Sequence, residues 1–157
     1  MIKYICVLLF SFILTNNMSY SRVRINWIET QIRMYNSEKN LHSLPIPIIV
    51  LSIKNDSDLP FEFHYREKGY FILEVGSLKI KMEHNWGGES KIILPKSNFK
   101  LKLTIENIMN TPTPKFYNFM LKIAKEGKLT YYLGSEEIKV VKENDSLIFI
   151  DGDLNDK

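Results

Sequence analysis

The stretch from Ile46 to Tyr65 constrains the fold of this chain more than any other part of its sequence. An apolar run rich in Ile and Val comes first, a polar turn at residues 55–58 follows with Pro60, and aromatic residues then alternate with polar ones. A β-branched run and a period of two are typical of β-strands, and Asn, Asp, Ser and Pro are typical of turns. We therefore expect two strands that form the middle of a β-sandwich, which is a scaffold and indicates no chemistry by itself.

The first 21 residues have the pattern of a secretory signal peptide. Lys3 gives a positive start, residues 4–14 are apolar, and Ser19 and Ser21 place small residues before a cleavage point. A retained membrane anchor is the alternative, but this apolar run is shorter than the ~20 residues that cross a bilayer as a helix. We expect cleavage after Ser21, a secreted or periplasmic protein, and no stable membrane anchor after cleavage.

Composition narrows the classes of function. Beyond the signal peptide 136 residues remain, which suffice for one domain with a full hydrophobic core, and they contain no cysteine because Cys6 is the only one. A secreted chain without disulfides depends on that core. The remaining 20 basic and 18 acidic residues are spread along the chain, so we expect no nucleic-acid partner, which would need a concentrated basic face. The abundance of Lys, Ile and Asn is typical of an AT-rich bacterial genome, whereas the Asn-X-Ser sequons at Asn55 and Asn144 would be glycosylation sites in a eukaryote.

Alternating patterns predict eight or nine short strands in a single domain over residues 22–150. In the first strand, residues 22–35, the alternation slips at Trp27 and Ile28, which indicates a β-bulge. Glycine-serine pairs at residues 76–77 and 134–135 predict two hairpin turns. Besides the strands of the central stretch, we expect strands at residues 70–75, 78–83, 91–94, 99–105, 128–133, 136–141 and 146–150. The acidic tail 151–157 is expected to be disordered.

One helix is expected at residues 114–126. Thr113 stands at the N-cap position, Pro114 at the first helical position, and Gly127 just past the end. Apolar residues recur between them with helical spacing at Phe116, Phe119, Met120, Ile123 and Ala124. This apolar face either closes the sandwich or forms a groove for a partner.

Short strands with frequent turn signals and a single crossover helix favour a mainly β, antiparallel sandwich over a barrel or an α/β fold. The run 49–55 with residues 57–60 resembles the second-to-third strand region of secreted bacterial immunoglobulin-like and fibronectin-like domains, where a strand ends in Asn and a polar turn leads to Pro. Residues 93–97 resemble the proline turn that such domains place before a later strand, although Lys96 stands where they usually have Gly. The resemblance implies an immunoglobulin-like β-sandwich and carries over no activity or site.

Residues suited to catalysis or metal binding occur without a recognisable spacing. The histidines, His42, His64 and His84, form no HxH or HExxH pattern, so we expect no metal site. His64 lies on the polar face of its strand, where we expect it to be solvated. No Ser or Cys stands in a nucleophile motif, and the carboxylates fit a solvated strand face, so we expect no cofactor and rank an enzyme third among our hypotheses.

The loop 84–89 is the best candidate for binding. His84 and Asn85 precede Trp86, and two glycines follow it. A Trp on such a tip offers a large contact area at low entropic cost, so we assign His84, Asn85 and Trp86 as candidate binding residues. The alternative is that Trp86 folds back over the end of the core.

The leading functional hypothesis is a secreted, non-catalytic interaction or accessory protein of the cell envelope, whose partner is another envelope or extracellular protein. The second hypothesis is a secreted inhibitor, for example of a protease, that uses the loop 84–89 as its contact. The candidate contact surfaces are therefore the loop that carries Trp86 and the apolar face of the helix.

Overall fold

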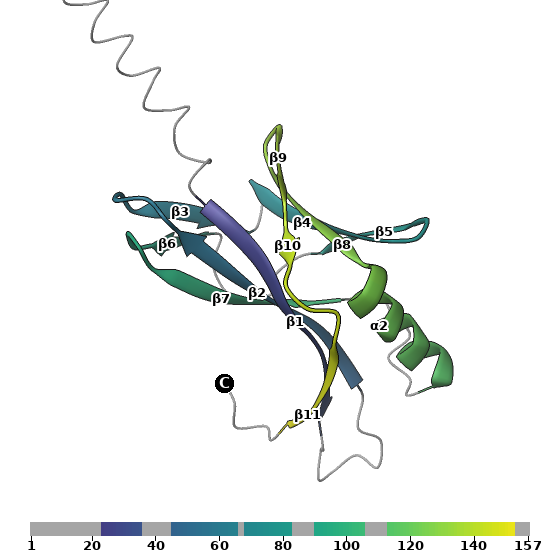
Figure 1. Ribbon diagram of the computed structural model, residues 1–157. Helices are drawn as coiled ribbons and strands as arrows, with labels where there is room; N and C mark the ends of the chain where they lie inside the picture. Colours follow the sequence, from purple (N-terminus) through teal and green to yellow (C-terminus); the bar gives the residue numbers. More distant parts are fainter. Residues whose placement is uncertain (1–22, 36–44, 66–67, 83–89, 106–112, 153–157) are drawn as a thin grey trace, which may run out of the picture.

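The computed structural model of the protein describes residues 23–35, 45–65, 68–82, 90–105 and 113–152. These residues form a mainly β fold with three sheets and one helix (Figure 1). The expected signal peptide and the residues after Gly152 lie outside the described part of the chain. No helix among the described residues is long and apolar enough to span a membrane.

The largest sheet is built around β1 (Val23–Tyr35), the longest strand. β1 pairs antiparallel with β2 (Pro45–Asn55), and β2 pairs antiparallel with β7 (Asn98–Thr104). On its other side β1 pairs in parallel with β10 (Val141–Lys142) and β11 (Leu147–Gly152). The predicted antiparallel pairing holds for β1, β2 and β7, but this sheet is mixed because β10 and β11 run parallel to β1. Alternation reveals which face of a strand is buried, whereas strand direction depends on how the chain returns to the sheet.

β1 contains the β-bulge that its alternation predicts, because its register with β2 shifts between Trp27 and Glu29. Before the bulge, Ile25 and Trp27 are buried in the core, and after it Ile32 is buried there as well. The extra residue shifts the alternation by one position, so both halves of β1 bury apolar side chains in the same core.

The other two sheets share one hydrophobic core with the first. One consists of β3 (Phe61–His64) and β6 (Ser90–Ile93). The other has the order β5-β4-β8-β9 and consists of β4 (Gly69–Val75), β5 (Leu78–Met82), β8 (Lys128–Leu133) and β9 (Glu136–Lys139). Its two hairpins turn at Gly76 and Gly134, whose φ angles of 61° and 58° suit the predicted glycine-serine turns.

The two strands of the central stretch, β2 and β3, do not pair with each other. β2 lies in the largest sheet and β3 in the two-stranded sheet, so the polar turn between them carries the chain from one sheet to another (Figure 1). The turn after Asn55 is therefore the corner at which the chain passes between these two sheets.

The predicted helix is present as α2 (Pro114–Glu126). The Thr113 hydroxyl accepts a hydrogen bond from the Phe116 N–H at 3.3 Å, and the Gly127 N–H donates to the carbonyl of Ile123 at 2.9 Å. The buried side of the helix consists of Phe116, Met120, Ile123 and Ala124. Because these residues belong to the core or adjoin it, α2 closes one end of the space between the sheets.

Aromatic rings fill the centre of the core. The ring of Tyr131 lies 4.8 Å from that of Phe63 and 4.9 Å from that of Phe71. The Tyr131 hydroxyl donates a hydrogen bond to the backbone carbonyl of His64. A Cβ atom on Gly69 would collide with this carbonyl and with the Tyr131 hydroxyl, so the close approach of β4 requires glycine there.

Candidate functional site

The binding residues predicted from the sequence, His84, Asn85 and Trp86, lie outside the described residues. β5 ends at Met82 before them, and β6 begins at Ser90 after them. Contact between this loop and a partner therefore stays a prediction.

His64, which the structure does describe, takes part in a surface pair. It is half-buried on β3, and its Nε2 atom lies 3.9 Å from Oε2 of the exposed Glu62. Glu62 also accepts a hydrogen bond from the Ser90 hydroxyl, which is the main cause that lowers the pKa of this carboxyl. Within residues 23–35, 45–65, 68–82, 90–105 and 113–152, no three His, Cys, Asp or Glu side chains gather where they could hold a metal ion.

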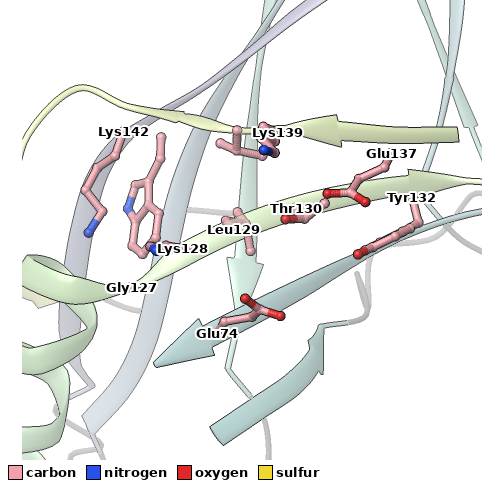
Figure 2. A pocket seen from close by; sticks show the side chains of 11 residues that line it. Glu74, Gly127, Lys128, Leu129, Thr130, Tyr132, Glu137, Lys139 and Lys142 are labelled. Atoms are coloured by element: carbon pink, nitrogen blue, oxygen red, sulfur yellow. The ribbon is translucent and has the colours of Figure 1, made fainter. Parts of the chain in front are cut away.

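A groove of about 470 Å³ lies where the β5-β4-β8-β9 sheet meets β1 and β10 (Figure 2). Leu129 and Thr130 of β8 lie in its middle, Lys142 stands at one end and Tyr132 at the other (Figure 2). The groove forms here because the chain leaves this sheet after β9 and joins β1 as β10.

Both signs of charge line the groove. Its charged residues are Glu74, Lys128, Glu137, Lys139 and Lys142. Lys79 of β5 lies 2.5 Å from the Glu74 carboxylate, and its hydrogen bond is the main cause that lowers the pKa of Glu74. The groove thus presents charged groups of both signs, with the Glu74 carboxylate paired to Lys79 at its margin.

Trp27 and Lys142, which contact each other, line one end of the groove (Figure 2). The Lys142 Nζ atom lies 4.5 Å from the centre of the Trp27 ring and donates a hydrogen bond to the carbonyl of Ala124 at 2.8 Å. It thereby satisfies a carbonyl at the C-terminal end of α2, where a cation is favourable. Burial lowers the pKa of Lys142, and Asp145, 3.8 Å away, partly offsets this effect.

A second feature lies at the end of β2, where two turns meet at Asn55. The fully buried Asn55 donates hydrogen bonds from Nδ2 to the carbonyls of Leu59 at 2.8 Å, Ile93 at 3.1 Å and Leu94 at 3.3 Å. Its Oδ1 atom accepts from the N–H and the hydroxyl of Ser57 at 3.0 and 2.7 Å. One side chain therefore fixes both the turn after β2 and the turn after β6.

Three large apolar side chains are exposed around these turns, and we call them the apolar tip. Leu59 is 70%, Ile92 65% and Leu94 64% exposed. Exposed side chains of this size cost free energy in water, and a group of them indicates a contact surface. Because Asn55 holds the backbone at Leu59 and Leu94, the tip is preformed.

Ion pairs surround the turn beside the apolar tip. Asp56 accepts a hydrogen bond from Arg24 Nε at 2.5 Å and lies 3.3 Å from the ammonium of Lys54. The hydrogen bond from Arg24 is the main cause that lowers the pKa of Asp56. Lys96 lies 3.1 Å from the Asp58 carboxylate and donates to the backbone carbonyl of Asp56 at 2.7 Å, so it ties the two turns together.

The sequence identified each turn but missed that they meet, because Asn55 and Leu94 are far apart in the chain. A local signal was present at both places. Leu59 precedes Pro60 and Leu94 precedes Pro95, so each polar turn contains an apolar residue that a turn does not bury. The groove had no such signal, since its residues come from five strands and the end of α2.

The chain matches no protein-family model and no curated protein. Its function therefore has to be inferred from the surfaces of the structure.

Proposed function

We propose that this chain is a secreted, non-catalytic interaction protein of the cell envelope that docks on a partner protein through its apolar tip. The observation that carries the proposal is the exposure of Leu59 and Leu94 on turns that Asn55 holds in place, with the exposed Ile92 next to them on β6. A preformed apolar surface loses little conformational entropy on binding, so more of its burial energy contributes to affinity.

The fold we propose is an immunoglobulin-like β-sandwich. In its support, the sheet of β1, β2 and β7 and the two smaller sheets share one core, and the chain passes between these layers after β2 and through α2. Two packed β layers joined by such crossings are typical of sandwiches. The turns at the end of a sandwich are natural contact sites because the strands hold them rigidly.

The surroundings of the apolar tip define the chemistry of the partner. Leu59, Ile92 and Leu94 fit an apolar pocket, and each Å² of apolar surface that they bury there contributes about 25 cal/mol. Asp58 and Lys96 lie beside them with side chains 83% and 63% exposed, ready to bond polar groups at the rim of the pocket. We expect an envelope or extracellular protein whose surface has an apolar pocket with a polar rim.

The test compares the captured partners of the natural chain and of the variants Ile92→Lys and Leu94→Lys. Leu78→Lys is the matched control, because Leu78 is 45% exposed at the β4–β5 hairpin. We expect a protein from the envelope fraction to bind again after purification, at least tenfold more weakly to either tip variant and equally to the control. Equal binding by the tip variants would overturn the docking site, and recovery of the chain in the cytoplasmic fraction would overturn secretion.

Inhibition of a hydrolase is the second candidate function, and the rigidity of the turn from Asn55 to Pro60 favours it. A loop held by internal hydrogen bonds keeps one conformation when an enzyme binds it. If the captured partner is a protease, the natural chain should suppress its activity at equimolar concentration, and Leu94→Lys should restore that activity. A protease that stays fully active in the complex would exclude inhibition.

A further inference from the structure

The C-terminal strand β11 is an exposed apolar edge of the largest sheet. Among the described residues, β11 pairs with β1 alone, along the end of β1 from Thr30 to Tyr35 (Figure 1). Phe149 is 60% and Ile148 36% exposed. The run Leu147–Ile150 contains no charged residue and no proline, the two features that most often protect an edge strand.

The side of α2 continues this apolar surface. The ring of Tyr117 lies 5.9 Å from that of Phe149, and Leu121, one helical turn further on, is 40% exposed. Tyr117 and Leu121 flank the buried face of α2: Tyr117 is partly buried against the core and contacts Phe149, whereas Leu121 is exposed. Within the described part of the chain, this surface thus combines backbone groups of β11 that face no further strand with apolar side chains from two elements.

Charge distinguishes β11 from the edge strands β5, β7 and β9. β5 and β7 each carry two lysines, and an antiparallel copy of the same strand would place lysines opposite or next to each other. Three of the four residues of β9 are charged, so its pairing would bury little apolar area. Within Leu147–Ile150, β11 can face its own copy with no like charges opposed, because every side chain there is apolar. Asp151, the next residue of β11, does not face its own copy as long as the two-fold axis lies within this run.

We infer that two copies of this chain associate through β11, which pairs antiparallel with the β11 of the second copy about a two-fold axis. The pairing satisfies the free backbone groups of both edges, and it joins the two largest sheets into one continuous sheet. Phe149 of each copy packs near the two-fold axis, where aromatic side chains on neighbouring strands stabilise each other. The second copy is the occupant because the uncharged strand is complementary to itself, and a two-fold pair covers both exposed edges at once.

The first test measures the mass of the purified full chain by sedimentation over a hundredfold range of concentration. We expect the mass to double as the concentration rises, and Phe149→Lys and Ile148→Lys to weaken the association at least tenfold, because each places like charges close together. Val141→Lys is the matched control, since Val141 is 61% exposed on the neighbouring β10 and outside the proposed contact. A monomer at every concentration would overturn the inference, and so would association that both strand variants leave unchanged.

The second test fixes the geometry by cysteine crosslinking in a Cys6→Ser background. Cysteine replaces one residue at a time, at Leu147, Ile148, Phe149 or Ile150. In an antiparallel pair, a residue lies close to the same residue of the second copy only near the two-fold axis. Intermolecular disulfides should therefore form only at the positions next to the axis. Equal crosslinking at all four positions, or none at any, would refute the antiparallel pair.

The dimer surface and the apolar tip lie at opposite ends of β1, since Asn55 pairs with Val23 whereas β11 pairs with residues 30–35. The tip variant Ile92→Lys should therefore dimerise normally, and Phe149→Lys should still bind the envelope partner. Failure of one proposal thus leaves the other standing.

Discussion

Replacement of Asn55 by Ala tests whether one buried amide holds the two turns of the apolar tip together. The change removes the hydrogen bonds to the carbonyls of Leu59, Ile93 and Leu94 and the two that Oδ1 accepts from Ser57. The backbone hydrogen bond from the Asn55 N–H to the carbonyl of Ser97, at 2.9 Å, remains. The variant should therefore keep the sheet and loosen the turns.

The magnitude follows from the number of bonds. The two protons of the amide are shared among three carbonyls, so its removal eliminates the equivalent of two donated and two accepted hydrogen bonds. A typical hydrogen bond contributes about 1 kcal/mol to stability, and water can reach the carbonyls of the exposed Leu59 and Leu94, which reduces the loss. We expect the free energy of unfolding to fall by about 2–4 kcal/mol, a large share of the ~5–15 kcal/mol of a typical domain.

Urea unfolding followed by circular dichroism measures this change. Asn98→Ala is the matched control, because Asn98 is exposed on β7 and its loss should alter stability by less than about 0.5 kcal/mol. Asn55→Ala should also weaken partner binding, since a loosened tip has to be ordered again on docking. A loss below about 1 kcal/mol would show that the turns hold without Asn55, and the account of a preformed tip would be wrong.

Three further predictions concern other parts of the fold. Gly69→Ala should destabilise the protein by at least about 2 kcal/mol, because its Cβ meets the His64 carbonyl and the Tyr131 hydroxyl. Gly134→Ala should destabilise it by only ~1 kcal/mol, because the cost there comes from the positive φ alone. Equal losses of stability in thermal unfolding would contradict the close approach at β4. Thr113→Ala should lose about 1 kcal/mol of unfolding free energy and Thr113→Asp should retain most of it, because Asp also caps a helix; an unaffected Ala variant would show that the cap is unimportant. In Arg24→Met the pKa of Asp56, followed by NMR titration, should rise toward its ordinary value. In the natural chain, ionised Asp56 stabilises the fold at pH values above the ordinary pKa of Asp, and this contribution is lost as the pH falls through the lowered pKa of Asp56 in the folded state. A pKa of Asp56 that is the same in Arg24→Met and in the natural chain would refute the pairing.

Local features of the fold were predictable because their causes lie within a few residues of chain. Thr113, Pro114 and Gly127 set the ends of α2, and the helix has the predicted bounds. The slip at Trp27 predicted the bulge in β1, and the glycine-serine pairs predicted both hairpins. In each case the backbone preference of one or two residues decides the structure.

Sheet membership, strand direction and the candidate surfaces were beyond such reasoning. The alternation in the central stretch predicted that Phe61 and Phe63 are buried, but it could not reveal that β3 pairs with β6 instead of β2. The parallel course of β11 beside β1 depends on where the chain travels after β9. Which strands become neighbours is settled by packing of the whole core, in which residues far apart in sequence compete for the same partners.

By itself the sequence determined the β-rich class, the helix, the turns and which face of most strands is buried, because these follow from local preference and from the removal of apolar side chains from water. Only the tertiary structure decided that the turns at Asn55 and Leu94 share one buried amide, and that a groove opens between β10 and the neighbouring sheet. It also decided that β11 ends as an exposed edge. The physical reason is that these hydrogen bonds and surfaces are formed by segments far apart in the sequence, and no local pattern predicts that such segments meet. They exist only once the three sheets have packed around their common core.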